Sequence, residues 1–252
     1  MKRILKLALA RLGYSVQGTR CCPRQLFDAA YLRSLELDDV VSCRMFECGR
    51  ELTFVQIGGF DGVTGDPLHK HIAKHGWRGV VVEPQSRAVS KLRDLYRGND
   101  RIVILQAALD CECRSRKLYT IESETAPQWA GGLASFRRET IVKHSGLVPG
   151  LETMIKEEYV ECITFEQVLE YLPGRYVDVL QIDAEGADGY ILSLFPLERV
   201  RPAIIHWEVK HLTKTEKEDC LDRLISFCYK FAPSGGEDML AVHIPTDHHP
   251  VG

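Results

Sequence analysis

A glycine-rich turn after a short apolar run constrains the fold of this chain more than any other feature. Residues 53–57 predict a buried strand, and the next segment, 58–62, contains three glycines, which permit positive φ angles or a close approach between backbones. Asp66 and Pro67 then form the N-cap and first residue of a predicted helix. Strand, glycine turn and helix make up the first half of a nucleotide-binding unit. The glycine spacing differs from G-x-G-x-x-G, so the dinucleotide fingerprint is absent.

An acid and two small residues follow the next two predicted strands. The strand at 79–82 ends at Glu83, where folds of this type bind the ribose hydroxyls of an adenosine with a carboxylate. The strand at 102–105 leads to Ala107 and Ala108, whose small side chains leave room for a flat adenine ring. A solvated glutamate and ordinary tight packing are the structural alternatives. The pattern favours a ligand that contains adenosine.

Acidic residues also follow the apolar strand predicted at 177–182. Asp183, Glu185 and Asp188 lie at the carboxyl end of this central strand, where α/β sheets place their ligands. Two interpretations are open for these acids. They can collect a divalent cation, because hard oxygen ligands suit magnesium, or they can stabilise the start of the next helix through its dipole.

The composition fits one large α/β core. The chain has 252 residues, of which 45% are hydrophobic, and its formal net charge of −3 with a pI near 6.3 provides no general attraction for nucleic acid. Its 9 cysteines are an odd number without a C-x-x-C pair, which predicts a reduced, cytoplasmic protein. Cys43 with Cys48, or Cys111 with Cys113, would need a second pair to form a structural zinc site. We therefore predict neither a bound metal nor a nucleic-acid partner.

The N-terminal segment, residues 1–50, is predicted to form a helical cap on a catalytic domain at 51–252. Residues 1–14 mix lysine and arginine with leucine and isoleucine, which predicts an amphipathic helix that packs on protein or on an anionic membrane surface. This stretch is too short to span a bilayer, and its charges interrupt a signal peptide. A second helix is predicted around residues 26–35.

Strands and helices alternate along the rest of the chain. Strands are predicted at 117–121 and 159–163, and the residues between them, 122–158, are expected to form a long aperiodic loop that acts as a substrate lid. A closing hairpin makes the last strand, 239–244, antiparallel to its neighbour. The predicted N-caps are Ser86, Thr164 and Thr215, the last two in capping boxes with Gln167 and Glu218.

Several linked motifs resemble those of the FkbM-type S-adenosylmethionine-dependent methyltransferases. The resemblance covers about residues 53–244 in order. It implies a class I methyltransferase fold, which is a Rossmann-like, seven-stranded, mostly parallel sheet with an antiparallel last strand and helices on both faces. It also implies methylation of hydroxyl or related oxygen groups of small molecules or glycans, such as sugars and polyketides. The motifs are Gln56 to Gly62, Glu83-Pro84, Gln181 to Gly186 and Glu208-x-x-His211-Leu212.

The same resemblance implies the residues that bind S-adenosyl-L-methionine. The glycine turn would contact the methionyl group, Glu83 the ribose diol, and Asp183 the amino group or the substrate. Gly59 and Phe60 stand where alanine and asparagine are usual in the family. The implied cofactor-binding residues are Gln56, Gly58, Gly59, Phe60, Asp61, Glu83, Pro84, Ala107, Ala108 and Asp183.

Methyl transfer to oxygen also needs a group that accepts the hydroxyl proton. His206 and Glu208 share one face of the strand predicted at 203–209. The reference pKa of histidine suits a base, but a histidine on a core strand is often structural. Glu208 and His211 match the family motif. The candidate catalytic residues are His206, Glu208, Asp183 and His211.

Two other functional classes stay open. An NAD-dependent or nucleotide-sugar oxidoreductase would share the Rossmann-like sheet and the ribose-binding acid, but the glycine fingerprint of that class is missing. A cofactor-binding module without catalysis is disfavoured by His206, Glu208 and the long loop. The acceptor pocket would come from the least patterned regions, 15–50 and 122–158, which do not identify the acceptor. A homo-oligomer is equally open.

Overall fold

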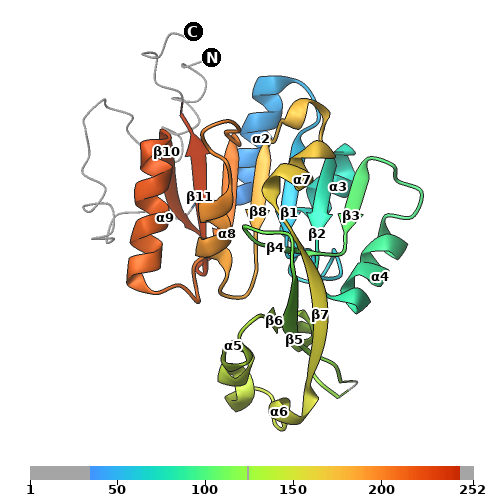
Figure 1. Ribbon diagram of the computed structural model, residues 1–252. Coiled ribbons are helices and arrows are strands. Elements are labelled where there is room, and N and C mark those ends of the chain that lie inside the picture. Colours follow the sequence, from blue (N-terminus) through green and yellow to red (C-terminus); the bar gives the residue numbers. More distant parts are fainter. Residues whose placement is uncertain (1–34, 124, 245–252) are drawn as a thin grey trace.

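The computed structural model describes residues 35–123 and 125–244. The main sheet has seven strands, all parallel except β11, which runs antiparallel to both of its neighbours. The predicted sheet, with its antiparallel last strand, is therefore confirmed (Figure 1). Across the sheet the strands are β10 (Tyr229–Ser234), β11 (Asp238–His243), β9 (Ile204–Glu208), β8 (Val179–Ile182), β1 (Thr53–Ile57), β2 (Arg78–Val82) and β3 (Ile102–Leu105).

Alternating side chains along the strands fill two hydrophobic cores, one on each face of the sheet. On β1, Val55 and Ile57 belong to the first core and Phe54 to the second. The predicted helices on both faces are thus confirmed. The first face is covered by α7 (Phe165–Glu170), α8 (Asp188–Leu194) and α9 (Lys214–Ser226), and the second by α2 (Leu37–Cys48), α3 (His69–His75) and α4 (Ser86–Leu95).

The inserted segment, residues 122–158, forms a small folded unit, so the prediction of an aperiodic loop was wrong. Its apolar side chains, among them Leu133, Ile141 and Leu151, build a hydrophobic core of their own. Helices and strands this short have no periodicity that a sequence pattern can reveal. Figure 1 shows the unit extending beyond the main sheet. It contains η2 (Gln128–Gly132), β6 (Ala134–Ser135), α5 (Arg138–Val142), η3 (Lys143–Gly146) and α6 (Leu151–Met154).

A second, four-stranded sheet carries the inserted segment. Its long strand β7 (Ile155–Ile163) pairs antiparallel with β5 (Ser115–Ile121), which confirms both strands predicted in this region. β7 also pairs in parallel with β4 (Ala108–Leu109), close to the end of β3. The inserted segment is therefore joined to the carboxyl edge of the main sheet.

The structure contains two capping boxes, and one of them begins two residues before its predicted position. Thr164 and Gln167 form the predicted box at α7. At α9 the box uses Thr213 and Glu216, so the prediction of Thr215 was wrong. The chain holds two overlapping Thr-x-x-Glu patterns here, and only the fold selects between them. A short helix, η4 (Pro173–Arg175), follows α7.

Ser86 is the first residue of α4 rather than its N-cap. Its hydroxyl donates to the Glu158 carboxylate of β7 at 3.4 Å, a tertiary contact that the local pattern does not contain. The helices predicted at 1–14 and around 26–35 lie outside the described residues, apart from Leu35, and α2 was not predicted. Within residues 35–123 and 125–244, none of the helices has the length and hydropathy needed to cross a membrane.

Candidate functional site

The glycine turn brings the end of β1 against the ends of its neighbours. Gly58 and Gly62 have φ angles of 80° and 75°. A Cβ atom at Gly58 would lie 1.7 Å from the carbonyl oxygen of Asp183, and a Cβ atom at Gly59 would lie 2.2 Å from Val81 Cγ1. The positive φ angles and close approaches expected from the sequence are therefore confirmed.

Glu83 is buried at the end of β2, and the protein backbone orients its carboxylate. Its Oε2 accepts a hydrogen bond from the Phe60 amide at 2.8 Å, and its Oε1 accepts one from the Gln85 amide at 2.9 Å. Burial raises the pKa of Glu83 to about 7, although these two N–H groups oppose the shift. Each oxygen keeps a further lone pair for a ligand hydroxyl. Contact with a ribose stays a prediction.

Asp61 stabilises the turn. Its Oδ1 accepts hydrogen bonds from the amides of Val63 and Thr64, and its Oδ2 accepts one from the Thr64 hydroxyl. Burial alone would raise the pKa of Asp61, but the hydrogen bonds from Thr64 and Val63 outweigh it, so the pKa is lowered. The geometry thus gives Asp61 a role in the shape of the turn.

Phe60 connects the glycine turn to the inserted segment. Its φ of 41° is unusual for a residue other than glycine. Its ring lies 3.6 Å from the positions that Cβ atoms would take at Gly131 and Gly132. The Gln85 side-chain amide adds a hydrogen bond to the Gly132 carbonyl oxygen at 3.1 Å. Phe60 and Gln85 therefore hold η2 against the turn.

The alanines implied to border adenine are buried just after β3. Ala107 and Ala108 are 4% and 7% exposed, and Pro84 is half-buried after the neighbouring strand β2. Gln56 lies within β1, and its side chain opposes the rise that burial causes in the pKa of Asp66. The ends of β2 and β3 are adjacent in the sheet, as the predicted adenosine site requires.

Acidic side chains meet at the carboxyl ends of β8 and β9. Each of Asp183, Asp188 and Glu208 offers an oxygen, and these oxygens lie within 4.8 Å of one another. Asp66 is also close, since its charge adds to burial in raising the pKa of Asp183. The prediction of Asp66 as N-cap and Pro67 as first helical residue was wrong, because α3 begins at His69 with Leu68 as its N-cap, although Asp66 Oδ1 accepts hydrogen bonds from the Leu68 and His69 amides. The place of Asp66 directly after the glycine turn was a signal for the site. We call Asp66, Asp183, Asp188 and Glu208 the acidic edge.

The acidic edge holds more negative charge than its surroundings neutralise. Burial raises the pKa of Glu208 to about 9 and that of Asp188 to about 7, and Asp183 contributes to both shifts. Lys210 opposes the shift at Glu208 only in part. The Asp183 side chain is exposed to solvent, yet the protein atoms around it raise its pKa as well. Such a cluster favours a cationic ligand.

The family motif residues Glu208 and His211 do lie together. The Nε2 atom of His211 is 3.8 Å from Glu208 Oε2 and 3.6 Å from Glu185 Oε2. Burial lowers the pKa of His211. Three of the four candidate catalytic residues, Asp183, Glu208 and His211, are thus brought together by the fold.

The fourth candidate, His206, lies inside the sheet. Its Nδ1 atom is 2.7 Å from Gln181 Oε1 on β8, and its Nε2 atom is 3.6 Å from Asp238 Oδ2 on β11. Burial lowers the pKa of His206 to about 4. Both ring nitrogens face protein partners, which favours a structural role over that of a base.

We expect His206→Ala to destabilise the fold and to leave turnover close to normal. The substitution removes a buried ring and leaves Gln181 without its partner, at a cost of about 1–3 kcal/mol. Urea unfolding measures the loss, and His75→Ala on α3 serves as the control. A stable variant with turnover lowered by about 100-fold or more would instead make His206 the base.

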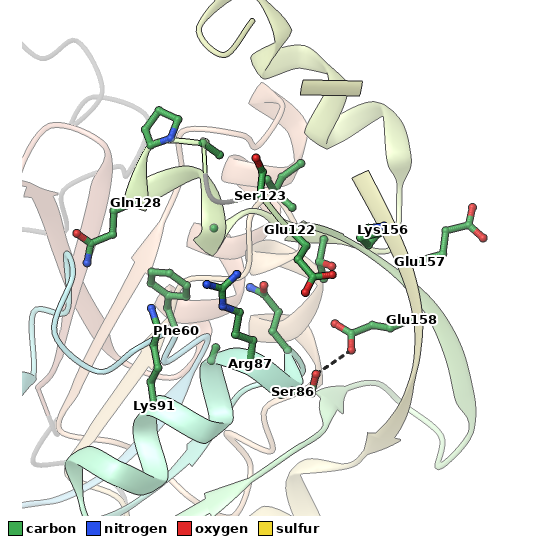
Figure 2. A pocket seen from close by; sticks show the side chains of 17 residues that line it. Phe60, Ser86, Arg87, Lys91, Glu122, Ser123, Gln128, Lys156, Glu157 and Glu158 are labelled. Carbon is green, nitrogen blue, oxygen red and sulfur yellow. Dashed lines mark hydrogen bonds between the residues drawn. The ribbon is translucent and has the colours of Figure 1, made fainter. Parts of the chain in front are cut away.

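A cavity of about 460 Å³ opens between α4 and the inserted segment (Figure 2). Phe60 and Gln85 line it, but neither Glu83 nor any residue of the acidic edge does. Figure 2 shows Arg87 and Lys91 beside Phe60 at this cavity. Its lining of hydroxyl, amide and charged groups suits a polar ligand. The cavity adjoins the candidate site, which consists of the glycine turn, Glu83 and the acidic edge.

Comparison with known proteins gives a family match. The sequence profile of the family described as Methyltransferase FkbM domain matches residues 56–236. Among solved structures, the chain is similar to methyltransferase FkbM from Methylobacillus flagellatus KT, with 12% identity and a TM-score of 0.49 over 77% of this chain. That match spans only 44% of the other chain. A search of curated proteins gives no match.

Two further solved structures are similar over most of the chain. One is fibrillarin from Aeropyrum pernix in complex with natively bound S-adenosyl-L-methionine, at 10% identity and a TM-score of 0.41, covering 91% of this chain and 86% of that one. The other is a SAM-dependent O-methyltransferase from Thermotoga maritima, at 8% identity and a TM-score of 0.39, covering 89% and 72%.

Proposed function

Because the chain belongs to the FkbM methyltransferase family, we propose that it transfers a methyl group from S-adenosyl-L-methionine to a hydroxyl oxygen of a small molecule or glycan. The observation that carries this proposal is the acidic edge beside the glycine turn. Within the described residues, Asp66 Oδ2 and Glu208 Oε2 are buried without a hydrogen-bond partner. The ammonium and sulfonium groups of that cofactor are cations of the kind that such oxygens stabilise.

The residues around the turn fit the rest of the cofactor. Glu83 would accept hydrogen bonds from the ribose hydroxyls, and Ala107 and Ala108 would border the adenine. The backbone of the turn at Gly58 would contact the methionyl group, since Gly58 packs directly against the Asp183 backbone and so places the turn beside the acidic edge. One extended ligand would then lie across the ends of β1, β2 and β8, in contact with the turn, Glu83 and the acidic edge.

When bound, S-adenosyl-L-methionine supplies an electrophilic methyl group, and the protein must align the acceptor oxygen in line with it. We place the acceptor hydroxyl beside Asp183 and Glu208. The bound cationic cofactor would lower the raised pKa values of these acids, and the ionised carboxylate could then receive the hydroxyl proton. His211 would orient Glu208 from 3.8 Å. The inserted segment, which Phe60 holds against the turn, would exclude water from the reacting groups.

Cofactor affinity is expected to rise with pH. The pKa of Glu83 is raised to about 7, and ribose hydroxyls and the cationic ligand favour its ionised form. Below this pKa the carboxyl group must first lose a proton, so binding should be about tenfold weaker near pH 6 than near pH 8. Calorimetric titrations at both pH values measure the difference.

The variant Glu83→Gln tests the assignment of this pH dependence. It should weaken binding near pH 8 by about 1–3 kcal/mol and remove the part of the pH dependence that Glu83 causes. Glu161→Gln, at an exposed position of β7 that does not line the cavity, is the matched control. An unchanged affinity in Glu83→Gln would leave that carboxylate a structural role only.

The reaction itself is tested by a screen of hydroxyl-bearing acceptors with isotopically labelled S-adenosyl-L-methionine. We expect a sugar, glycan or polyketide to gain the mass of one methylene group as an ether that resists mild base. A product methylated on nitrogen would contradict the proposed acceptor chemistry, although the chain would still be a methyltransferase.

A further inference from the structure

We propose that His144, Glu185 and His211 bind one divalent transition-metal ion. This ion would link the inserted segment to the main sheet at the carboxyl ends of β8 and β9. Each residue offers one ligand atom, and the three atoms lie within 4.8 Å of one another. The residues come from three separate elements: His144 from η3, Glu185 from the turn before α8, and His211 from the segment after β9. Two imidazoles and a carboxylate form a ligand set that suits zinc and its first-row neighbours.

The proposed ligands are available for a metal. The Nε2 atom of His144 is buried and has no hydrogen-bond partner in the part of the chain that the structure describes. The His144 and His211 rings meet edge to face, with centroids 5.7 Å apart and an angle of 73° between the ring planes. The Glu185 carboxylate lies 3.6 Å from His211 Nε2. Small side-chain rotations would bring all three atoms onto one ion.

Glu185 is held in this place at a cost in backbone energy. Its φ of 48° lies in the left-handed region, which residues other than glycine rarely adopt. Asp188 fixes the turn on both sides, because its carboxylate accepts hydrogen bonds from the amides of Ala184 and Gly186, both at 3.0 Å. Local backbone strain of this kind is concentrated at functional sites.

Neighbouring charges are compatible with an ion at this position. Two cations, Lys143 and Lys210, act on both histidines, and the Nζ atom of Lys210 lies 2.9 Å from the Glu237 carboxylate. Glu208 lies 3.8 Å from His211 Nε2, so it adds a further carboxylate beside the proposed ion. The acidic edge is a weaker metal site, because the Asp188 carboxylate is already committed to backbone amides.

Zinc binding to the full chain tests the proposal directly. The background carries C111S, C113S, H248A and H249A, because two exposed thiols and two adjacent imidazoles outside the described residues can bind zinc adventitiously. We expect one zinc ion per chain by calorimetry. Binding should also raise the melting temperature, since it is selective for the folded state.

Trp129 provides an optical signal for the same site. Its ring centroid is 6.1 Å from that of His144, and its side chain is partly exposed, whereas Trp77 and Trp207 are fully buried. Titration with Co²⁺ should therefore quench the fluorescence of Trp129. In Trp129→Phe this quenching should disappear while zinc affinity stays unchanged.

We expect zinc affinity to fall by more than about 100-fold in each of the variants His144→Ala, Glu185→Gln and His211→Ala. This loss exceeds that caused by removing a residue that only hydrogen-bonds to a ligand, which is about 10-fold to 100-fold. His75→Ala on α3 is the matched control. Unchanged affinity in His144→Ala, or loss of the ion only in Asp183→Asn and Glu208→Gln, would overturn the proposal, as would absence of zinc binding in the background chain. His144→Ala should still bind S-adenosyl-L-methionine, so failure of this site is distinguishable from failure of the proposed function.

Discussion

Gly58→Ala is expected to cost the fold at least about 3 kcal/mol and to abolish cofactor binding. The new Cβ atom would lie 1.7 Å from the carbonyl oxygen of Asp183 and 2.8 Å from its carbonyl carbon, and neither backbone atom can rotate away. Relief requires β1 and β8 to separate at the point where the Asp183 amide donates to the Ile57 carbonyl oxygen at 2.9 Å. Chemical denaturation with and without S-adenosyl-L-methionine measures both losses.

Gly65→Ala is the matched control for this substitution. Gly65 has a similar φ of 70°, but no atom outside its immediate neighbours lies within 4 Å of a Cβ placed there. Its replacement therefore imposes the backbone strain without the collision, at about 1–2 kcal/mol. If Gly58→Ala lost no more stability than Gly65→Ala, the close approach of the turn to β8 would be contradicted.

Glu208→Gln is expected to lower turnover at saturating cofactor by about 100-fold to 10,000-fold, with a smaller loss of cofactor affinity because Glu208 belongs to the acidic edge. The amide keeps the shape of the side chain but cannot receive the acceptor proton. Glu208 stands at the end of β9, with an Oε2 atom that has no hydrogen-bond partner within the described residues. Initial rates at saturating cofactor, once an acceptor is known, measure the effect.

Glu218→Gln on α9 is the control, because that carboxylate is exposed and pairs only loosely with Lys214 at 3.9 Å. His211→Ala should give a smaller fall in turnover if its part is to orient Glu208. Near-normal turnover in Glu208→Gln together with a large loss in Asp183→Asn would move the proton-accepting role to Asp183. Near-normal turnover in both would show that neither carboxylate receives the proton.

Much of the sheet could be predicted because buried parallel strands are continuous apolar runs. The strands at 53–57, 79–82 and 102–105 match β1, β2 and β3 closely. The helix α2 was missed since it buries only Leu37 and Val41 and has little amphipathic pattern. The inserted segment was missed because its short helices are stabilised by their shared core, which no local pattern reveals.

The candidate site could be predicted where it lies at strand ends. Glu83, Asp183 and Glu208 follow buried strands, and the carboxyl ends of parallel strands converge on one edge of the sheet. The position of His144 could not be predicted, because the fold of the inserted segment decides that it meets His211. The interpretation of His206 as a base rested on its reference pKa, whereas the pairing of β8 and β9 places Gln181 against it.

The central claim is that the glycine turn, Glu83 and the acidic edge form the binding site for S-adenosyl-L-methionine. Calorimetric titration of the full chain with this cofactor, with its demethylated product and with NAD tests the claim most directly. We predict saturable binding of both sulfur compounds, a higher melting temperature with each of them, and no comparable response to NAD. Binding of NAD without any response to either sulfur compound would contradict it and would favour an oxidoreductase instead.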